Sequence, residues 1–121
     1  MDVDYSILAD FGAWIAVARE VEPLFGLMAD ETVFQEALRQ AISQKDAFCI
    51  RTTPNGHSRT LKGGIVISKA ANEIAWLAVS QKYRNMGCGL RLLTFAVNEL
   101  NPREDIFVQT FDESVFEGRA A

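Results

Sequence analysis

The sequence predicts a mixed α/β fold (α+β) with a mostly antiparallel sheet flanked by helices. Two observations carry this prediction: runs of strand and helix periodicity follow one another in the order β-α-α-β-β-β-α-β, and three of the strands come in succession with short turns between them. At 121 residues, with 49% apolar and 23% charged residues, the chain is expected to bury one core. A single domain over residues 1–121 follows.

The first part of the chain predicts one short strand and two helices. Residues 5–8 are a short apolar run typical of a strand. A first helix is expected to end at Pro23, and residues 25–28 form an apolar connector to a second helix that Asp30 can cap. The apolar residues of the first helix recur at helical spacing: Phe11, Trp14, Ile15, Ala18 and Val21. Those expected to form the buried face of the second helix are Phe34, Ala37, Leu38, Ala41 and Ile42.

Three strands are then expected in succession. Residues 47–52 and 61–68 are strand-like, and the turn residues 54–57 between them indicate a hairpin. Residues 69–72 make the next turn, and residues 73–79 form a further apolar strand. These short connections predict antiparallel neighbours.

The last two predicted elements are a helix and a strand. Residues 90–100 have helical periodicity, the helix stops at Asn101 and Pro102, and residues 105–110 form the strand. The helix is expected to pack through Leu90, Leu93, Val97 and Leu100. Because it separates the strands at 73–79 and 105–110, those two can pair in parallel.

A glycine-containing loop joins the strand at 73–79 to this helix. Residues 84–89 read Arg-Asn-Met-Gly-Cys-Gly. Such a loop presents unpaired N–H groups at the positive end of a helix dipole, which binds phosphate or pyrophosphate. Because Leu90 and Arg91 follow the second glycine, a Walker-type loop is excluded, and only two of the three glycines of a dinucleotide-binding motif exist. The loop predicts an anionic, nucleotide-like ligand.

The loop has the form Arg/Gln-x-x-Gly-x-Gly/Ala, and with its flanks it resembles the GNAT superfamily of N-acetyltransferases. Residues 73–84 resemble the family's fourth strand and its lead into the loop, residues 63–68 resemble its third strand, and the whole resemblance spans residues 60–111. It implies the GNAT fold, acetyl-CoA as cosubstrate and direct acetyl transfer to a primary amine. In that fold the fourth and fifth strands are parallel and splay apart, so that their exposed backbone groups bind the pantetheine arm.

The resemblance also implies roles for single residues. The backbone N–H of Leu77 would meet the thioester carbonyl, and backbone groups of Leu77 and Val79 would bind the pantetheine. A Cβ at Gly87 or Gly89 could obstruct the phosphate. The N–H groups that would bind the pyrophosphate are those of Arg84, Asn85, Met86, Gly87, Cys88, Gly89 and Leu90.

Glu73 is the candidate general base that the resemblance implies. It precedes Arg84 by eleven residues, the same separation as between the catalytic glutamate and the loop in the histone-acetylating members of the family. A carboxylate on this strand can take the amine proton directly or through water. A glutamate at a strand start can equally be a solvated turn residue or only orient the acceptor. Arg84 likewise has two interpretations, a charge near the phosphate oxygens or a surface residue whose backbone alone is used.

The remaining candidates each have a functional and a structural interpretation. Phe25 and Met28 lie in the connector that borders the acceptor site in GNAT proteins, and they can line that site or pack in the core. Cys88 near a helix N-terminus can suggest an acyl-enzyme, whereas the resemblance implies direct transfer. Cys49 and Cys88 lack metal-ligand and disulfide spacing, so we expect reduced thiols and no metal. His57, the only histidine, is expected to be an exposed turn residue.

Composition restricts the partners. The net charge of −4 includes no basic stripe, which argues against nucleic acid and favours a cationic acceptor. No apolar stretch approaches the roughly 20 residues of a membrane span, and the N-terminus lacks a signal-peptide pattern. We expect a cytoplasmic protein with a small-molecule amine as acceptor, ahead of a protein amine.

The chain departs from the GNAT pattern after its last strand. GNAT domains continue with a helix, which often carries a tyrosine that protonates the thiolate, and with final strands, so the C-terminus here is expected to be shortened. Tyr5 and Tyr83 match neither the position nor the role of that tyrosine, which leaves the general acid unassigned. The strand at 105–110 is expected to show an open edge that a second copy or another partner covers. A non-catalytic CoA-binding or protein-interaction module is the alternative to an acetyltransferase.

Overall fold

The structure, a computed structural model, describes residues 2–53 and 60–108, with the backbone alone at residues 24 and 25. The strands within this part of the chain are β1 (Val3–Tyr5), β2 (Ala47–Arg51), β3 (Leu61–Ser68), β4 (Glu73–Val79) and β5 (Phe107–Val108). The α-helices are α1 (Phe11–Phe25), α2 (Thr32–Ser43) and α3 (Cys88–Glu99), and single 3₁₀ turns are η1 (Leu8–Asp10) and η2 (Gln81–Tyr83).

The strands form one sheet in chain order, β1-β2-β3-β4-β5. The pairs from β1 to β4 are antiparallel, while β4 and β5 are parallel and joined by α3 as the crossover. The predicted mixed α/β (α+β) class, the element order and the parallel final pair are confirmed. His57 lies outside the described residues, as do the last two positions of the strand predicted at 105–110.

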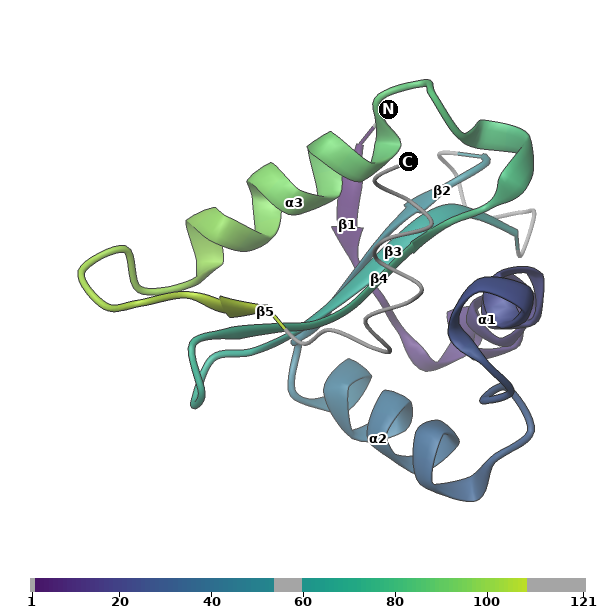
Figure 1. Cartoon of the computed structure of the whole chain (residues 1–121), viewed down its shortest axis with the longest axis horizontal. Helices are drawn as coiled ribbons and strands as arrows, with labels where there is room; N and C mark the ends of the chain where they lie inside the picture. The colour runs from purple at the N-terminus through teal and green to yellow at the C-terminus, as the bar shows by residue number, and fades with distance from the viewer. Residues whose placement is uncertain (1, 54–59, 109–121) are drawn as a thin grey trace.

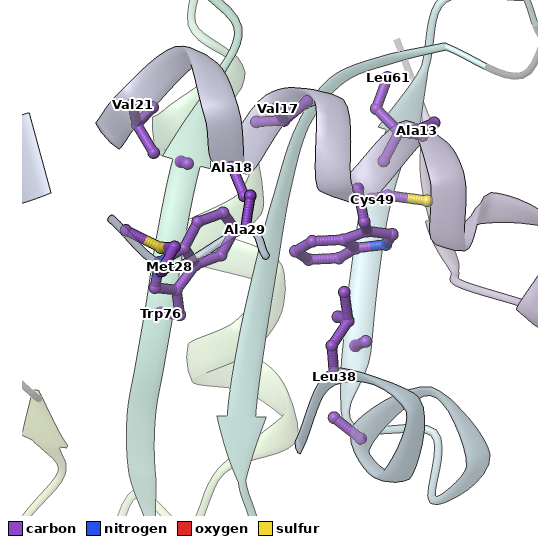
Figure 2. Close-up of a cluster of buried hydrophobic side chains, with 14 of the residues drawn as sticks. Ala13, Val17, Ala18, Val21, Met28, Ala29, Leu38, Cys49, Leu61 and Trp76 are labelled. Atoms are coloured by element: carbon purple, nitrogen blue, oxygen red, sulfur yellow. The ribbon is translucent and has the colours of Figure 1, made fainter. Parts of the chain in front are cut away.

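Helices cover both faces of the sheet, with α1 and α2 on one side and α3 on the other (Figure 1). On the α1/α2 face, the rings of Trp14 and Trp76 lie 5.6 Å apart, and Phe34 meets Trp76 edge-on at 5.7 Å. Figure 2 shows this cluster, to which α1 contributes Val17 and α2 contributes Leu38. The α3 face is packed with Phe48, Ile50, Ile65, Ile67, Ile74, Leu92, Ala96 and Leu100.

Two glycines at the centre of β3 allow both helical layers to approach the sheet. A Cβ on Gly64 would overlap the indole ring of Trp14 on the α1/α2 face. A Cβ on Gly63 would lie 2.8 Å from the carbonyl oxygen of Ala78 and 3.2 Å from Cδ1 of Leu92 on the α3 face. The sequence Gly63-Gly64 is therefore a packing requirement on both sides of one strand.

The N-terminal elements differ from the prediction in two places. The first strand is Val3–Tyr5 rather than 5–8, because the carboxylate of Asp10 accepts a hydrogen bond from the N–H of Ile7 (2.9 Å) and the chain turns there into η1. Pro23 does not end the first helix. It lies in the last turn, where a proline removes one helical hydrogen bond, and the helix continues to Phe25 and is followed by Gly26, whose φ is 91°.

The start and the buried face of α2 were only partly predicted. Glu31, not Asp30, occupies the N-cap position, and it makes no side-chain cap. Asp30 forms an ion pair with Arg19 of α1 instead. Leu38, Ala41 and Ile42 are buried as predicted, Phe34 is half-buried, and Ala37 is exposed.

The face predicted for α3 is wrong at Leu90, Leu93 and Val97 and correct at Leu100. The helix begins two residues earlier than predicted and buries Cys88, Leu92, Ala96 and Leu100. Leu90 is 70% exposed, and Leu93 and Val97 are also exposed. Both sets have helical spacing, but the small Cys88 and Ala96 let the helix lie close to β3, where Gly63 faces Leu92.

Candidate functional site

The loop predicted as an anion site connects β4 to α3. η2 follows β4, a turn covers residues 84–87, and α3 begins at Cys88. Gly87 is the N-cap of α3 with a φ of 85°, and Asn85 has a φ of 63°. Glycine and asparagine are the residues that best tolerate this left-handed conformation. The exposed turn thus leads into a helix N-terminus, where the first N–H groups have no partner within the helix.

Cationic side chains lie in and beside this loop. Lys82 lies in η2, just before the loop, and Arg84 lies in the loop; both side chains are exposed. Lys62 of β3 places its Nζ 5.3 Å from the ring centroid of Tyr83, which braces η2 against the sheet. These charges and the dipole of α3 both favour an anion.

The two glycines of the motif are constrained differently. Gly87 is required by its backbone, since a φ of 85° strains any residue with a Cβ. Gly89 has no positive φ, and a Cβ there would lie 3.7 Å from Cγ2 of Val79, an ordinary contact. Packing within the chain therefore does not explain the glycine at 89, whereas a ligand seated against the helix N-terminus would.

The two ends of β4 direct their backbone groups toward opposite neighbours. At the start, the carbonyl of Asn72 accepts a hydrogen bond from the N–H of Phe107 (3.0 Å), which points it toward β5. At the end, the N–H of Ser80 donates to the carbonyl of Lys62 (2.8 Å), which points it toward β3. In a regular strand two even-numbered residues would point the same way, so the alternation must be interrupted between them.

A β-bulge at Ala75 makes this interruption. Val66 pairs with Trp76, but the next residue of β3, Ile67, pairs with Ile74, so β4 contains one extra residue. Counting back from Ser80, alternate residues of β4 face β3, and the backbone groups of Leu77 and Val79 face the edge on which β5 lies. The bulge thus presents at this edge the two backbone positions to which the family resemblance assigns a role.

The edge of β4 is only partly occupied by β5. Between β4 and β5, Glu73 pairs with Phe107 and Ile74 pairs with Val108. Among the described residues no strand pairs with β4 on this side beyond Ile74. A row of backbone groups therefore runs from the glycine loop along Val79 and Leu77 toward the start of the strand.

Asn72 holds β5 beside the start of β4, a role that sequence reasoning did not identify. Its buried side chain donates from Nδ2 to the carbonyls of Asn101 (3.0 Å) and Asp105 (2.9 Å), and its Oδ1 accepts from the N–H of Asn101 (2.7 Å). Its φ of 52° suits asparagine. The available signal was an asparagine at the end of the predicted turn 69–72, directly before a strand.

Glu73 is the first residue of β4 and is half-buried. It lies opposite Ser68 of β3, and its side chain lies on the α1/α2 side because the next residue, Ile74, packs on the α3 side. Trp76 also lies on the α1/α2 side because of the bulge. At about 3.3 Å per residue, Glu73 is roughly 20 Å along the strand from Val79, so a ligand spanning loop and carboxylate must be long and extended.

The connector between α1 and α2 is ordered by the helix before it. The carboxylate of Glu22 accepts hydrogen bonds from the N–H groups of Met28 and Ala29, both at 3.0 Å, and these bonds lower its pKa. Met28 is 9% exposed and packs in the cluster of Figure 2. Its side chain therefore belongs to the core. Phe25 is the last residue of α1, and its side chain lies outside the described part.

Both cysteines are buried, and neither forms a disulfide. Cys88 is 1% exposed and packs on the α3 side of the sheet, a position unsuited to an acyl carrier. Burial raises the pKa of Cys49 to about 11, which keeps it a protonated thiol. Neither sulfur is placed to act as a nucleophile.

Two other kinds of feature are absent from the described residues. They contain no group of three or more histidine, cysteine, aspartate or glutamate side chains arranged to hold a metal ion. No helix among them has the length and apolar character needed to cross a membrane.

Comparison with solved structures identifies the fold. A GNAT-family acetyltransferase from Bacillus cereus is 11% identical with a TM-score of 0.60, and the match covers 78% of this chain and 60% of that chain. The PaiA N-acetyltransferase from Thermoplasma acidophilum in complex with coenzyme A is 21% identical with a TM-score of 0.63, over 81% of this chain and 70% of that one. The N-acetylglutamate synthase from Neisseria gonorrhoeae, complexed with coenzyme A and N-acetylglutamate, is 23% identical with a TM-score of 0.60. The match covers 81% of this chain and 22% of that chain.

The chain therefore has the fold of the GNAT N-acetyltransferases. It spans 60% of the length of the Bacillus cereus protein and 70% of that of PaiA. No protein-family model matches its sequence, and no curated protein matches it.

Proposed function

We propose that this chain is an acetyl-CoA-dependent N-acetyltransferase that acetylates a primary amine by direct attack. The observation that carries the proposal is the continuous path from the glycine loop along the β5-facing backbone of Val79 and Leu77 to Glu73. A small-molecule amine is the preferred acceptor and a protein amine the second. The coenzyme A bound to two proteins of the same fold, PaiA and N-acetylglutamate synthase, supports acetyl-CoA as cosubstrate.

The residues present fit the parts of acetyl-CoA. The turn at 84–87 and the first N–H groups of α3, through Leu90, would hold the pyrophosphate. Backbone groups of Leu77 and Val79 would hydrogen-bond the pantetheine, as an added strand would. The N–H of Leu77 would also stabilise the carbonyl oxygen as it becomes negatively charged in the transition state.

Glu73 supplies the proton acceptor in this proposal. The amine nitrogen attacks the thioester carbonyl carbon, and its proton passes to the Glu73 carboxylate directly or through water. The C–S bond then breaks, and the thiolate takes up a proton. Tyr5 bonds Glu99 at the β1 side of the sheet, and Tyr83 lies under Lys62, so neither described tyrosine serves the thiolate from the β5 edge.

The acceptor side is assigned to the connector after α1. Phe25 and the backbone at Met28 would border the acceptor, whereas the Met28 side chain stabilises the fold. The exposed Leu27 of the same connector offers an apolar contact.

Calorimetric titration with CoA, followed by a thiol-release assay with acetyl-CoA and a broad set of amines, tests the proposal. We expect CoA to bind and at least one amine to be acetylated. Failure of the native chain to bind CoA would contradict the proposal at its first step. CoA binding without turnover on any amine would favour the second candidate, a non-catalytic CoA-binding or protein-interaction module, which the lack of a positioned tyrosine among the described residues supports.

The oligomer or covering partner expected at residues 105–110 stays a prediction. Phe107 and Val108 of β5 are 58% and 57% exposed, which supports it. Size-exclusion chromatography with light scattering decides between assembly and a monomer, and a stable monomer would remove the oligomer from the proposal.

A further inference from the structure

The carboxylate of Glu20 holds the start of the segment that joins β4 to the glycine loop. Glu20 lies on α1, and this segment starts at Ser80, sixty residues further along the chain. The hydroxyl of Ser80 donates to the carboxylate at 3.0 Å from either oxygen, and the N–H of Gln81 donates to Oε1 at 3.1 Å. One exposed side chain therefore joins the end of β4 and the first residue of η2 to the helix on the α1/α2 face.

The charge of this contact is opposite to what an anion site would select. A carboxylate near a loop that binds phosphates repels them, and the repulsion acts over about 10 Å at moderate salt. Its two oxygens, however, accept hydrogen bonds from the hydroxyl of Ser80 and the N–H of Gln81. A carboxylate at this position is better explained by its two acceptor oxygens than by its charge.

Contacts and backbone angles restrain the residues between Gln81 and the N-terminus of α3. Lys62 braces Tyr83 on one side, and the left-handed residues Asn85 and Gly87 turn the chain into α3. A shift at Gln81 would be passed on to this turn, since no strand pairing restrains residues 81–87. A displacement of 1 Å in a binding group is enough to lose much of its contribution.

We propose that Glu20 is a positioning residue that sets the phosphate-binding turn through Ser80 and Gln81. This inference rests on the proposed function for its ligand, but the contact itself does not depend on that function. Glu20 would touch neither CoA nor the acceptor, and it would act only through the start of the loop.

Three variants distinguish a positioning role of Glu20 from an effect of its charge. Glu20→Ala removes both hydrogen bonds, and it should weaken CoA binding about tenfold, the loss expected for the two bonds together. Glu20→Gln keeps an acceptor oxygen and removes the repulsion, so it should bind CoA as tightly as the parent or more tightly. Ser80→Ala removes one of the two contacts and should weaken binding by about threefold. Glu36→Ala, which removes an exposed glutamate on α2, is the matched control and should change nothing.

Amide hydrogen exchange without ligand provides the second readout. We expect faster exchange at Gln81 and residues 82–87 in Glu20→Ala than in the parent, Glu20→Gln and Glu36→Ala, with the sheet amides unchanged. Unchanged exchange and unchanged CoA affinity in Glu20→Ala would overturn the inference. Equal losses in Glu20→Ala and Glu20→Gln would also overturn it, because the charge would then be the requirement. If the parent itself does not bind CoA, the proposed function fails, while the exchange rates still decide whether Glu20 positions the loop.

Discussion

The two ends of β4 are fixed by different means. At the start of the strand, Asn72 is buried, and its amide bonds the backbone of Asn101 and Asp105. At the other end, the exposed carboxylate of Glu20 bonds Ser80 and Gln81. A buried amide without partners is costly, whereas water can replace an exposed contact. The contacts of Asn72 at the start of β4 therefore contribute to the stability of the fold, whereas those of Glu20 at the end position the segment next to the ligand.

Removal of the Asn72 side chain should have the largest effect. Asn72→Ala leaves the N–H of Asn101 and the carbonyl of Asp105 without their partner, and it places at a φ of 52° a residue that tolerates the left-handed region less well than asparagine does. We expect a loss of about 3 kcal/mol in the free energy of unfolding, measured with urea. Asn72→Gly, which permits the φ, should lose about 1 kcal/mol less than Asn72→Ala. A change below 0.5 kcal/mol in both variants would show that β5 is held by other contacts.

Substitution of Glu73, at the same end of β4, should lower the rate of acetyl transfer without lowering stability. Glu73→Gln keeps the size of a half-buried side chain, so stability should change little. Acetyl transfer should fall about 100-fold if the carboxylate is the general base, while the affinity for CoA is retained. Turnover within about threefold of the parent would assign Glu73 to the solvated or acceptor-orienting role.

The two glycines of the loop should respond differently. Gly87→Ala forces a Cβ residue into a φ of 85° and should cost about 1 kcal/mol of stability as well as CoA affinity. Gly89→Ala has room in the fold, with Cγ2 of Val79 at 3.7 Å, so it should leave the thermal midpoint unchanged and lower CoA affinity alone. Undiminished CoA binding in Gly89→Ala would place the phosphate elsewhere.

The smallest expected effect is the pH dependence of the hydrogen bonds that Glu22 accepts from the connector between α1 and α2. The hydrogen bonds from Met28 and Ala29 lower the pKa of Glu22 below 4.5, so their stabilising contribution is present above pH 4.5 and is lost as the pH falls through the folded pKa. The amide proton shifts of these two residues should titrate below pH 4.5. The Glu22→Gln variant should abolish that titration, and a midpoint above 4.5 in the parent would contradict the assignment.

Local sequence patterns were sufficient for much of the framework. The bounds of β3 and β4 were predicted as they are found, since apolar strand-forming residues are flanked by polar turns at both ends. The glycine loop was recognised because its conformation depends on residue type, with Asn85 and Gly87 supplying the left-handed positions. The backbone positions Leu77 and Val79 came from the family resemblance, and their direction toward β5 is a consequence of the bulge at Ala75.

Features that depend on tertiary contacts were missed. The stripes Cys88-Leu92-Ala96 and Leu90-Leu93-Val97 both fit a helix, and only the close approach at Gly63 selects the first. Nothing in the local sequence marks the extra residue in β4, because a bulge is defined by its partner strand. The bond from Glu20 to Ser80 joins positions sixty residues apart and has no sequence signal of its own.

Amide chemical-shift mapping during a CoA titration would show directly whether this edge and loop bind acetyl-CoA. We expect the largest shifts at Leu77, Val79, Gly87 and Gly89, which join the β5-facing edge of β4 to the N-terminus of α3. Shifts confined to the α1/α2 face, or no shifts at saturating CoA, would contradict the assignment of this edge and loop as the acetyl-CoA site.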